Sequence, residues 1–400
     1  MVKSMTRPPA AFLPLSASPG ALRAVSRRQA LAALAALPAA FHAPLRADDA
    51  GPIRIGQSTA LTGPLADLGL PSSHGARACF AALNARGGVN GRPIELAVVD
   101  DGYDVARALG NVKGFLEDRG NFAIFNCLGT PMVEAMLPQV TASGVPFFAP
   151  LTGALSARPK NARNVFNIRA SYADETAHLV QHLATVGIKR IAVVSQNNAF
   201  GKDVAHAAEL SMAKHNLTEG VSATVESDAS DALAAATKVA GSKAEAVLVG
   251  LAGKPTTEFV KALRALRKGM PVYALSVMGA SATLKAMGPD ASGINVSQVV
   301  PLPTSSNVPV VRDFLADWKA AAAPLEPSHL ALEGYINARV FAEVLRRAGR
   351  NPTRAAFIDS AWGTKRLDLG GFEVSFNEGA PNASRYVELT MVDRNGRFIR

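Results

Sequence analysis

From Pro52 onward the chain alternates strand-like and helix-like segments, and this alternation is the strongest constraint on its fold. Short apolar runs such as "IRIGQST" (53–59) and "KRIAVVSQ" (189–196) indicate strands. Helical patterns separate successive runs. Strands separated by helices of roughly ten to fifteen residues form βαβ units, in which helices cover both faces of a parallel sheet. The pattern therefore predicts an α/β fold of doubly wound parallel sheets.

The predicted segments fall into two successive groups. The first has strands at 53–59, 93–101, 122–127 and 145–150, and helices at 75–88, 104–118 and about 132–142. The second has strands at 189–196, 220–227, 244–250, 271–276 and 294–300, and helices at about 173–186, 200–215, 230–241, 256–268 and 281–287. Helical stretches at 308–321, 329–348 and 352–360 and a β-rich end follow. Because 400 residues exceed one ordinary domain, we expect two α/β lobes.

The amino-terminal segment carries an export-signal pattern and much of the excess charge. The formal net charge is +10, but the first 47 residues hold six of the 42 basic residues and no acid, which leaves 36 basic against 32 acidic residues. That balance argues against a nucleic-acid partner. Within 26–41, Arg27 and Arg28 precede an apolar run too short to span a bilayer. We expect an export signal of secretory or twin-arginine type over 1–47, and a soluble mature protein.

The cysteines and histidines give no metal site. Cys79 and Cys127 either pair in an oxidising compartment or remain two buried thiols, and both alternatives stay open. Neither is accompanied by a second cluster of ligands. His178 and His182 are four residues apart on a predicted helix, but no Glu lies between them, which favours two surface histidines. We expect no metal and no cofactor.

Enzyme motifs are absent or broken. No G-x-G-x-x-G follows the first strand, which disfavours a dinucleotide site. In "GLAGKPT" (250–256) a phosphate loop is excluded, because Leu248 takes the place of its first Gly and Pro255 that of its Ser or Thr. Ser281 lacks the closing Gly of a nucleophile elbow. With no catalytic constellation in the sequence, we expect a binding protein rather than an enzyme.

Small polar loops follow the predicted strands in both groups. They include "STALTGPLADLG", "CLGTP", "PLTGA" and "SQNNAFGKD". In open parallel sheets, ligands bind beyond the carboxyl ends of the strands. Thr130 and the pair Thr152-Gly153 would present hydroxyls and backbone N–H groups at helix amino termini, which suit a carboxylate. The loops therefore predict a ligand cleft between the two lobes.

The order of these motifs resembles the periplasmic leucine/isoleucine/valine-binding proteins, the type I substrate-binding components of ABC transporters. The most specific parts are the "TGP…G" loop, "NARGGVNGRPI" (84–94) and "DDGYD" (100–104), and the similarity extends from about Pro52 to Phe398. It implies a first lobe of 52–168 plus 304–376, a second lobe of 172–299 plus 385–400, and hinges near 169–171, 300–303 and 377–384.

The resemblance also implies how such a protein acts. A monomer in the periplasm would close its cleft over a small-molecule solute, and an ABC permease with its ATPase subunits would read the closed form. The protein itself would do no chemistry. The same fold also serves ligand-sensing partners of membrane signalling receptors, and this second function stays open.

The resemblance places nine residues of this chain at the ligand. They are Leu68, Thr130, Leu151, Thr152, Gly153, Tyr172, Phe200, Val277 and Met278. The acidic residue that pairs with a ligand ammonium is expected near 277, where this chain has Val277 and Met278. Because an ammonium buried without a carboxylate is costly, we expect an aromatic or aliphatic acid rather than a branched-chain amino acid.

Three further departures from the family pattern concern single residues. Gly153 stands where amino-acid binders often have Thr, and Phe200 replaces a frequent Tyr. Tyr103 occupies the position of a family cysteine, which excludes that family's disulfide. Glu175 has two alternative roles: it supplies the missing carboxylate, or it compensates the dipole in the first turn of its helix.

Overall fold

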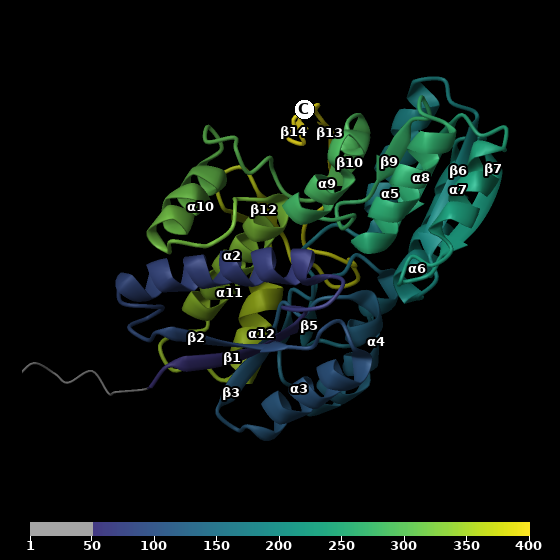
Figure 1. The fold of residues 1–400 in the computed structure, drawn as a ribbon. Coiled ribbons are helices and arrows are strands. Elements are labelled where there is room, and N and C mark those ends of the chain that lie inside the picture. Colours follow the sequence, from purple (N-terminus) through teal and green to yellow (C-terminus); the bar gives the residue numbers. More distant parts are fainter. Residues whose placement is uncertain (1–50) are drawn as a thin grey trace, which may run out of the picture. The chain divides into compact units, whose positions relative to one another are not determined.

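The computed structural model describes residues 51–400, so the predicted export signal over 1–47 lies outside the described residues. Within 51–400, no helix is at once long enough and apolar enough to cross a membrane. The described residues form two sheets that are each covered by helices, as the alternation of segments predicts (Figure 1).

The first sheet has five parallel strands in the order β2-β1-β3-β4-β5. Its strands are β1 (Ile53–Thr59), β2 (Ile94–Asp100), β3 (Asn121–Phe125), β4 (Phe147–Phe148) and β5 (Val165–Phe166). The connections contain α2 (Ala66–Ala85), α3 (Val105–Glu117), α4 (Thr130–Ser143) and the short 3₁₀ helix η1 (Leu155–Ala157). We call this sheet with its helices the first lobe.

The second sheet has seven strands in the order β14-β13-β10-β9-β8-β6-β7 and forms the second lobe with its helices. Its strands are β6 (Arg190–Gln196), β7 (Thr218–Val225), β8 (Ala246–Gly250), β9 (Val272–Ala274), β10 (Ile294–Gln298), β13 (Glu388–Val392) and β14 (Phe398–Ile399). Its helices are α5 (Tyr172–Thr185), α6 (Ala199–Lys214), α7 (Ala232–Ala240), α8 (Lys254–Leu266), α9 (Ser281–Met287) and η2 (Gly288–Ala291). Within this sheet β13 pairs antiparallel with both β10 and β14, and the other strand pairs are parallel.

After β10 the chain leaves the second lobe and packs against the first lobe, before it returns to the second lobe with β13 and β14. The helices α10 (Pro309–Ala320), α11 (His329–Arg347) and α12 (Arg354–Gly363) pack in one core with α2 and the first sheet. A small hairpin of β11 (Leu367–Asp368) and β12 (Glu373–Val374) follows. The chain then runs back beside the predicted first hinge, where Ala383 N donates to Asn167 O at 2.9 Å. The lobe limits and hinge positions given above stay predictions.

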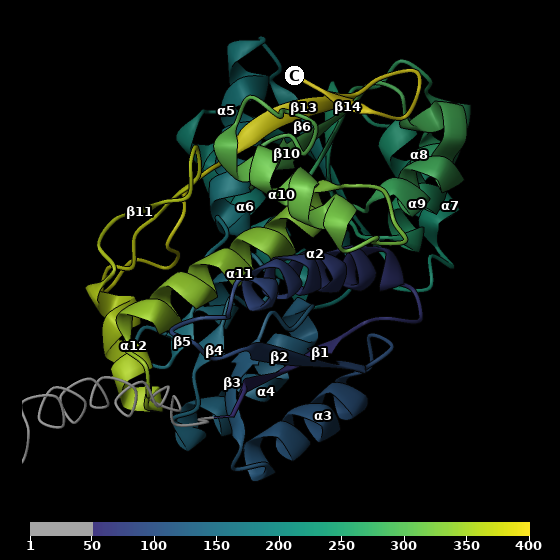
Figure 2. The same ribbon diagram turned by 90° about the vertical axis from the view of Figure 1, so that its left-hand side faces the viewer.

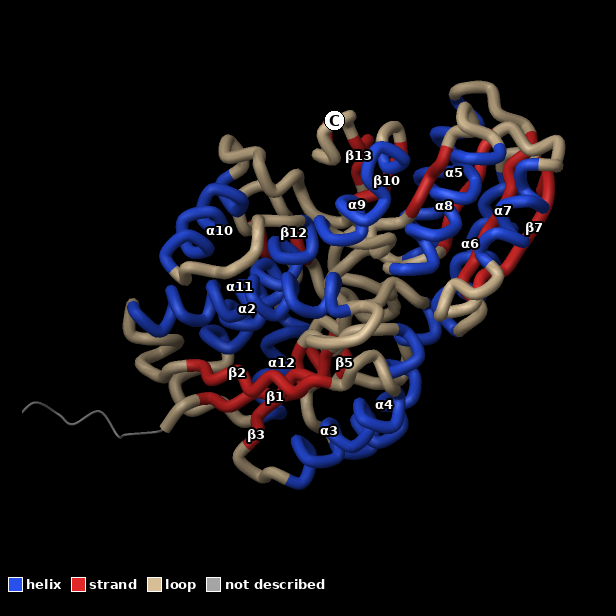
Figure 3. Tube along the Cα trace, in the orientation of Figure 1, coloured by secondary structure: helices blue, strands red, loops and turns tan. Residues whose placement is uncertain are grey.

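Each sheet lies between two layers of helices. Figures 1 and 2 show α2 and α11 on one side of β1 to β3, and α3 and α4 on the other. Figure 3 shows the strands of the first sheet between these layers. On the α2 side, Phe80, Phe125, Phe148 and Phe341 form an aromatic core with tilted and edge-to-face contacts. Such packing leaves the loops at the carboxyl ends of the strands to form binding surfaces.

A local signal explains where α3 begins but not where α2 begins. Asp104 caps α3 as predicted, because its carboxylate accepts from Arg107 N at 2.8 Å. Helix α2 begins at Ala66, nine residues before the predicted start, although Gly69 and Pro71 disfavour a helix. Gly69 is needed there, because a Cβ would overlap the Ala60 carbonyl oxygen. A close approach between α2 and the end of β1 thus overrides local propensity.

Candidate functional site

The loops at the carboxyl ends of strands from both sheets enclose a small cavity of about 20 Å³, which we call the cleft cavity. It is lined by Leu65, Leu68, Tyr103, Leu128, Gly129, Thr130, Leu151, Tyr172, Phe200, Ala252 and Val277. A space of this size holds about one water molecule. The lobes are therefore closed upon each other here, and entry of a solute requires the two walls to separate.

Six of the nine residues that the sequence places at the ligand line this cavity: Leu68, Thr130, Leu151, Tyr172, Phe200 and Val277. Thr152 lies behind the lining, with its hydroxyl 2.7 Å from that of Thr130. Gly153 also lies behind, against the Tyr172 ring, where a Cβ would overlap the ring atoms.

Met278 points away from the cavity. It is fully buried in the core of the second lobe, on the side of α7, α8 and α9. Its carbonyl oxygen accepts from Gly253 N at 2.9 Å and from Thr256 Oγ1 at 3.2 Å. The neighbouring Val277 therefore supplies the contact with the cavity at this turn.

Tyr103 is the main lining residue that the sequence did not single out as a contact. Its backbone is left-handed, with φ of 62°, and its N–H donates to Asp101 Oδ1 at 2.9 Å. The ring lies over Gly129, where a Cβ would come within 2.7 Å of the ring carbon Cε2. One feature of the sequence could have indicated this contact: Tyr103 follows the carboxyl end of the predicted strand at 93–101. Strained backbone of this kind is common at binding sites.

Tyr103, Tyr172 and Thr130 are the lining residues that carry side-chain hydroxyls. Burial raises the pKa of both Tyr103 and Tyr172 above the ordinary value for a phenol. Both hydroxyls thus stay protonated at neutral pH and are able to donate hydrogen bonds. The Tyr172 ring packs edge-on against Phe200, with 5.0 Å between the ring centroids. The arrangement offers hydroxyl donors beside an apolar surface.

None of the eleven lining residues carries a charge. The candidate carboxylate from the sequence, Glu175, is fully buried and accepts from Arg169 Nη2 at 3.2 Å, Ser276 N at 2.9 Å and Ser297 Oγ at 2.6 Å. Arg169 also contacts Glu333, with 3.5 Å between Nη1 and Oε1. Glu175 is therefore held in an internal ion-pair network that joins the lobes. Its place in the first turn of α5 agrees with the dipole role considered from the sequence, and its carboxylate is occupied by this network.

A carboxylate of the first lobe caps a helix of the second beside the cavity. Asp67 Oδ2 accepts from Ala280 N at 2.9 Å and from Thr283 N at 3.0 Å, and Oδ1 accepts from Ala282 N at 3.2 Å. We call this contact the Asp67 cap. It satisfies N–H groups at the start of α9 that the helix itself leaves without partners. The contact joins α2 of the first lobe to α9 of the second.

A second cavity, of about 580 Å³, lies beside the segment 276–281, which also contains Val277 of the cleft cavity. Ser276, Ala280, Gln298, His329 and Phe398 are among its lining residues. Burial, with Arg400 nearby, lowers the pKa of His329 to about 3, so this imidazole is neutral at physiological pH.

Cys79 and Cys127, for which the sequence left pairing as one alternative, are both buried free thiols within 51–400.

Comparison with known proteins gives one consistent family. The model of the family described as periplasmic binding protein matches residues 52–397. A curated relative, Leu/Ile/Val-binding protein homolog 3 of Brucella melitensis biotype 1 (strain 16M), is 22% identical over 350 residues, which cover 87% of this chain and 93% of the relative.

Solved structures share the fold over the same range. A substrate-binding periplasmic protein from Ralstonia solanacearum is 31% identical with a TM-score of 0.80, and the match covers 87% of this chain and 99% of that one. A solute-binding protein of an ABC transporter from R. palustris, in complex with benzoate, is 17% identical with a TM-score of 0.78, and the match covers 87% of this chain and 95% of that one.

Proposed function

Because the chain belongs to the periplasmic binding protein family, among the Leu/Ile/Val-binding proteins of ABC transporters, we propose that its solute is a small aromatic or aliphatic acid without an ammonium group. The family consists of binding proteins rather than enzymes, so the chain binds a substrate for transport and does not convert it. In this proposal the protein acts in the periplasm as a monomer and delivers its solute to a permease with ATPase subunits.

The observation that carries the proposal is the uncharged lining of the cleft cavity. Hydroxyls of Thr130, Tyr103 and Tyr172 are suited to donate to a carboxylate, and the leucines and Phe200 suit an apolar body. An ammonium would find no carboxylate there, because Glu175 is already bound by Arg169 and two serines. Burying an unpaired ammonium is costly enough to exclude it. The benzoate complex of the R. palustris protein is consistent with this solute class.

Closure of the lobes would couple binding to transport. A solute shifts the balance between open and closed forms only by its preference for the closed one. The Asp67 cap and the cleft lining both join the lobes, so they stabilise the closed form. The permease would then recognise the closed protein.

Isothermal titration calorimetry on the chain from Asp48 onward tests the proposal. The panel contains benzoate, phenylacetate, hexanoate, and as controls benzamide and methyl benzoate, which keep the apolar body but lack the carboxylate. We expect saturable one-to-one binding of at least one acid, and at least tenfold weaker binding of benzamide and methyl benzoate than of that acid. Saturable binding of valine or isoleucine with no binding of any acid would contradict the proposal.

A further inference from the structure

Four arginines line one small pocket at the edge of the first sheet opposite the cleft cavity. The pocket, which we call the arginine pocket, has a volume of about 140 Å³ and lies where β1, β3 and α12 begin. The cleft cavity adjoins the carboxyl ends of β1 and β3, so the two sites lie at opposite edges of the sheet. The lining comprises Pro52, Ile53, Arg54, Arg92, Arg119, Gly120, Asn121, Phe122, Pro352 and Arg354. It contains four positive charges and no acidic residue.

The described residues neutralise only part of this charge. Within 51–400, Arg54 forms an ion pair with Asp118, with 3.9 Å between Nη1 and Oδ2, and the two side chains are 53% and 50% exposed. Arg92, Arg119 and Arg354 form no ion pair with the residues that the structure describes. Because like charges close together repel one another, an anion in the pocket would stabilise this arrangement.

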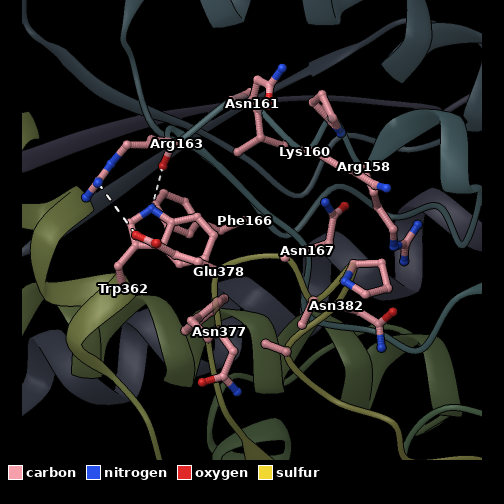
Figure 4. Close-up of a pocket in the computed structure, with 18 of the residues that line it drawn as sticks. Arg158, Lys160, Asn161, Arg163, Phe166, Asn167, Trp362, Asn377, Glu378 and Asn382 are labelled. Atoms are coloured by element: carbon pink, nitrogen blue, oxygen red, sulfur yellow. Dashed lines mark hydrogen bonds and ion pairs between the residues drawn. The ribbon is translucent and has the colours of Figure 1, made fainter.

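Arg163 shows the contrasting case, an arginine whose charge is balanced within the fold. It lines a different cavity, of about 480 Å³, beside α12 (Figure 4). Its Nη2 atom lies 3.4 Å from Asp359 Oδ1, and its Nη1 atom lies 3.6 Å from Glu378 Oε1. Figure 4 shows Glu378 facing Arg163, beside the Trp362 indole that donates to Arg163 O at 2.8 Å. Arg163 is therefore a matched control for the unpaired arginines.

Backbone carbonyls fix the direction of two guanidinium groups in the arginine pocket. Arg92 donates from Nε and Nη2 to Gly51 O, at 2.8 Å and 2.6 Å. Arg354 donates from Nε to Phe122 O at 3.3 Å and from Nη2 to Asn121 O at 2.6 Å. Since both use the same two nitrogens, Nη1 of each group remains for a ligand. Both side chains are partly exposed, so a ligand is able to reach them.

A glycine makes room for a third guanidinium group. A Cβ at Gly120 would overlap Arg54 Nη2, so a larger residue would push this group away. The neighbouring Arg119 is exposed and supplies the fourth charge. Arg354 is also the first residue of α12, and the amino end of a helix favours negative charge.

The charge and size of the pocket define the chemistry of a ligand. Three arginines without an acidic partner favour an anion with more than one charge, which a phosphate monoester is at neutral pH. Guanidinium N–H groups match the oxygens of a phosphate in geometry, and one phosphate accepts from several of them. The volume of about 140 Å³ is well below the roughly 300–1,000 Å³ of most small-molecule sites. The pocket therefore suits a single charged group, with the rest of the ligand in solvent.

We propose that the arginine pocket is a second binding site, for a phosphate monoester group. The group belongs either to a small soluble molecule or to the head group of an anionic lipid. Because the pocket and the cleft cavity lie at opposite edges of the first sheet, both are able to be occupied at once. The proposal is independent of the solute proposed for the cleft.

Calorimetric titration of the chain from Asp48 onward with inorganic phosphate and glycerol 3-phosphate, at low ionic strength, tests the soluble source. Dimethyl phosphate and glycerol are the matched ligands, with a single charge and with none. We expect saturable one-to-one binding of at least one of the two phosphates, and at least fivefold weaker binding of dimethyl phosphate. Added sodium chloride should weaken the binding, because salt screens exposed charges.

Substitutions then assign the binding to the pocket. We expect Arg119→Gln and Arg354→Gln each to weaken phosphate binding at least fivefold. Because Arg119 is exposed, its variant keeps the test valid if Arg354→Gln does not fold. Arg163→Gln removes an arginine that is already paired, and we expect a change below twofold. Arg119→Gln should leave the binding of acids in the cleft unchanged, so the two proposals fail independently.

Cosedimentation with vesicles distinguishes the two sources of the phosphate. Binding to phosphatidylcholine vesicles that contain phosphatidic acid, and not to phosphatidylcholine alone, supports a lipid source if Arg119→Gln abolishes it. Binding of the soluble phosphates alone supports a free monoester. The proposal is overturned if neither form binds, or if dimethyl phosphate binds as tightly as glycerol 3-phosphate. It is also overturned if Arg119→Gln and a folded Arg354→Gln bind phosphate as tightly as the wild type.

Discussion

Asp67 of α2 holds Thr283 of α9 across the closed cleft. Its Oδ2 atom accepts from both the backbone N–H of Thr283, at 3.0 Å, and the side-chain hydroxyl, at 2.8 Å. The carboxylate is therefore a helix cap supplied by the opposite lobe. A contact that joins two parts only in the closed state adds to the free energy of closure, and hence to solute affinity.

We expect Asp67→Ala to weaken solute binding about tenfold or more, since hydrogen bonds to a charged group contribute about 1.5–3 kcal/mol. Titration calorimetry measures the change. Asp104→Ala is the matched control, because it also removes a helix cap, but one that lies wholly within the first lobe. It should lower stability by about 1 kcal/mol without changing affinity. Equal affinities for wild type and Asp67→Ala would contradict the role of the cap.

The tyrosine hydroxyls should matter for binding and not for folding. We expect Tyr103→Phe and Tyr172→Phe each to reduce affinity for the acid about tenfold, because each removes one donor to a carboxylate. Since burial raises the pKa of both phenols, wild-type affinity should stay constant from pH 7 to about pH 9.5. Affinity that falls with a midpoint near pH 8 would show that these groups are not the donors.

Gly153 lies directly against the Tyr172 ring, so adding a single methyl group at Gly153 should disturb the site. In Gly153→Ala the new methyl group displaces the Tyr172 ring, which should cost about 1–3 kcal/mol of stability and weaken solute binding. Gly110→Ala serves as the control, because this glycine lies inside α3 with open space at its Cβ position. It should be neutral, or more stable by about 0.5–1 kcal/mol. Urea unfolding and calorimetry of both variants measure the two effects.

Glu175 should contribute to stability through its partners. Glu175→Gln removes the buried carboxylate that accepts from Arg169, Ser276 and Ser297, and we expect a loss of about 3 kcal/mol in the free energy of unfolding. Glu219→Gln, at an exposed position in β7, should change it by less than about 0.5 kcal/mol. Denaturation of the two variants in urea measures this difference. If Glu175→Gln were as stable as the wild type, the ion-pair network would not stabilise the folded protein.

We expect His329 to lower the free energy of unfolding as the pH falls. With a folded-state pKa of about 3 and an unfolded value of 6.5, the unfolded chain binds more protons between these limits. Stability from this group is thus complete above pH 6.5 and falls as the pH drops, by about 2 kcal/mol at pH 5. Urea unfolding at pH 8 and pH 5 should show a loss about 2 kcal/mol smaller for His329→Gln than for the wild type. An equal loss in both proteins would contradict a buried neutral His329.

Periodic patterns predicted the regular elements well, and close contacts explain where they did not. The strand at 53–59 and the helix at 281–287 have the predicted bounds, because turn residues flank their apolar patterns. The two-residue strands β5 and β11 are too short for any periodic signal. The early start of α2 depends on the contact of Gly69 with Ala60, which only the folded chain contains.

The candidate site could be predicted only in part, because a resemblance fixes loop positions and not side-chain directions. Val277 faces the cleft cavity whereas its neighbour Met278 faces the core, and no local signal separates the two. Tyr103 reaches the cavity through a left-handed backbone that single-sequence patterns do not reveal. The role of Glu175 depends on Ser276 and Ser297, which are more than one hundred residues away along the chain.

The most direct test compares acids with amino acids of the same carbon skeleton. Calorimetric titrations of the chain from Asp48 onward would use 4-methylpentanoate against leucine, and 3-phenylpropanoate against phenylalanine. The two members of each pair differ only by the α-ammonium, for which the cleft cavity has no carboxylate partner. We predict that the acid of at least one pair binds at least a hundredfold more tightly than its amino acid. Tighter binding of leucine or phenylalanine than of the matched acid would contradict the account.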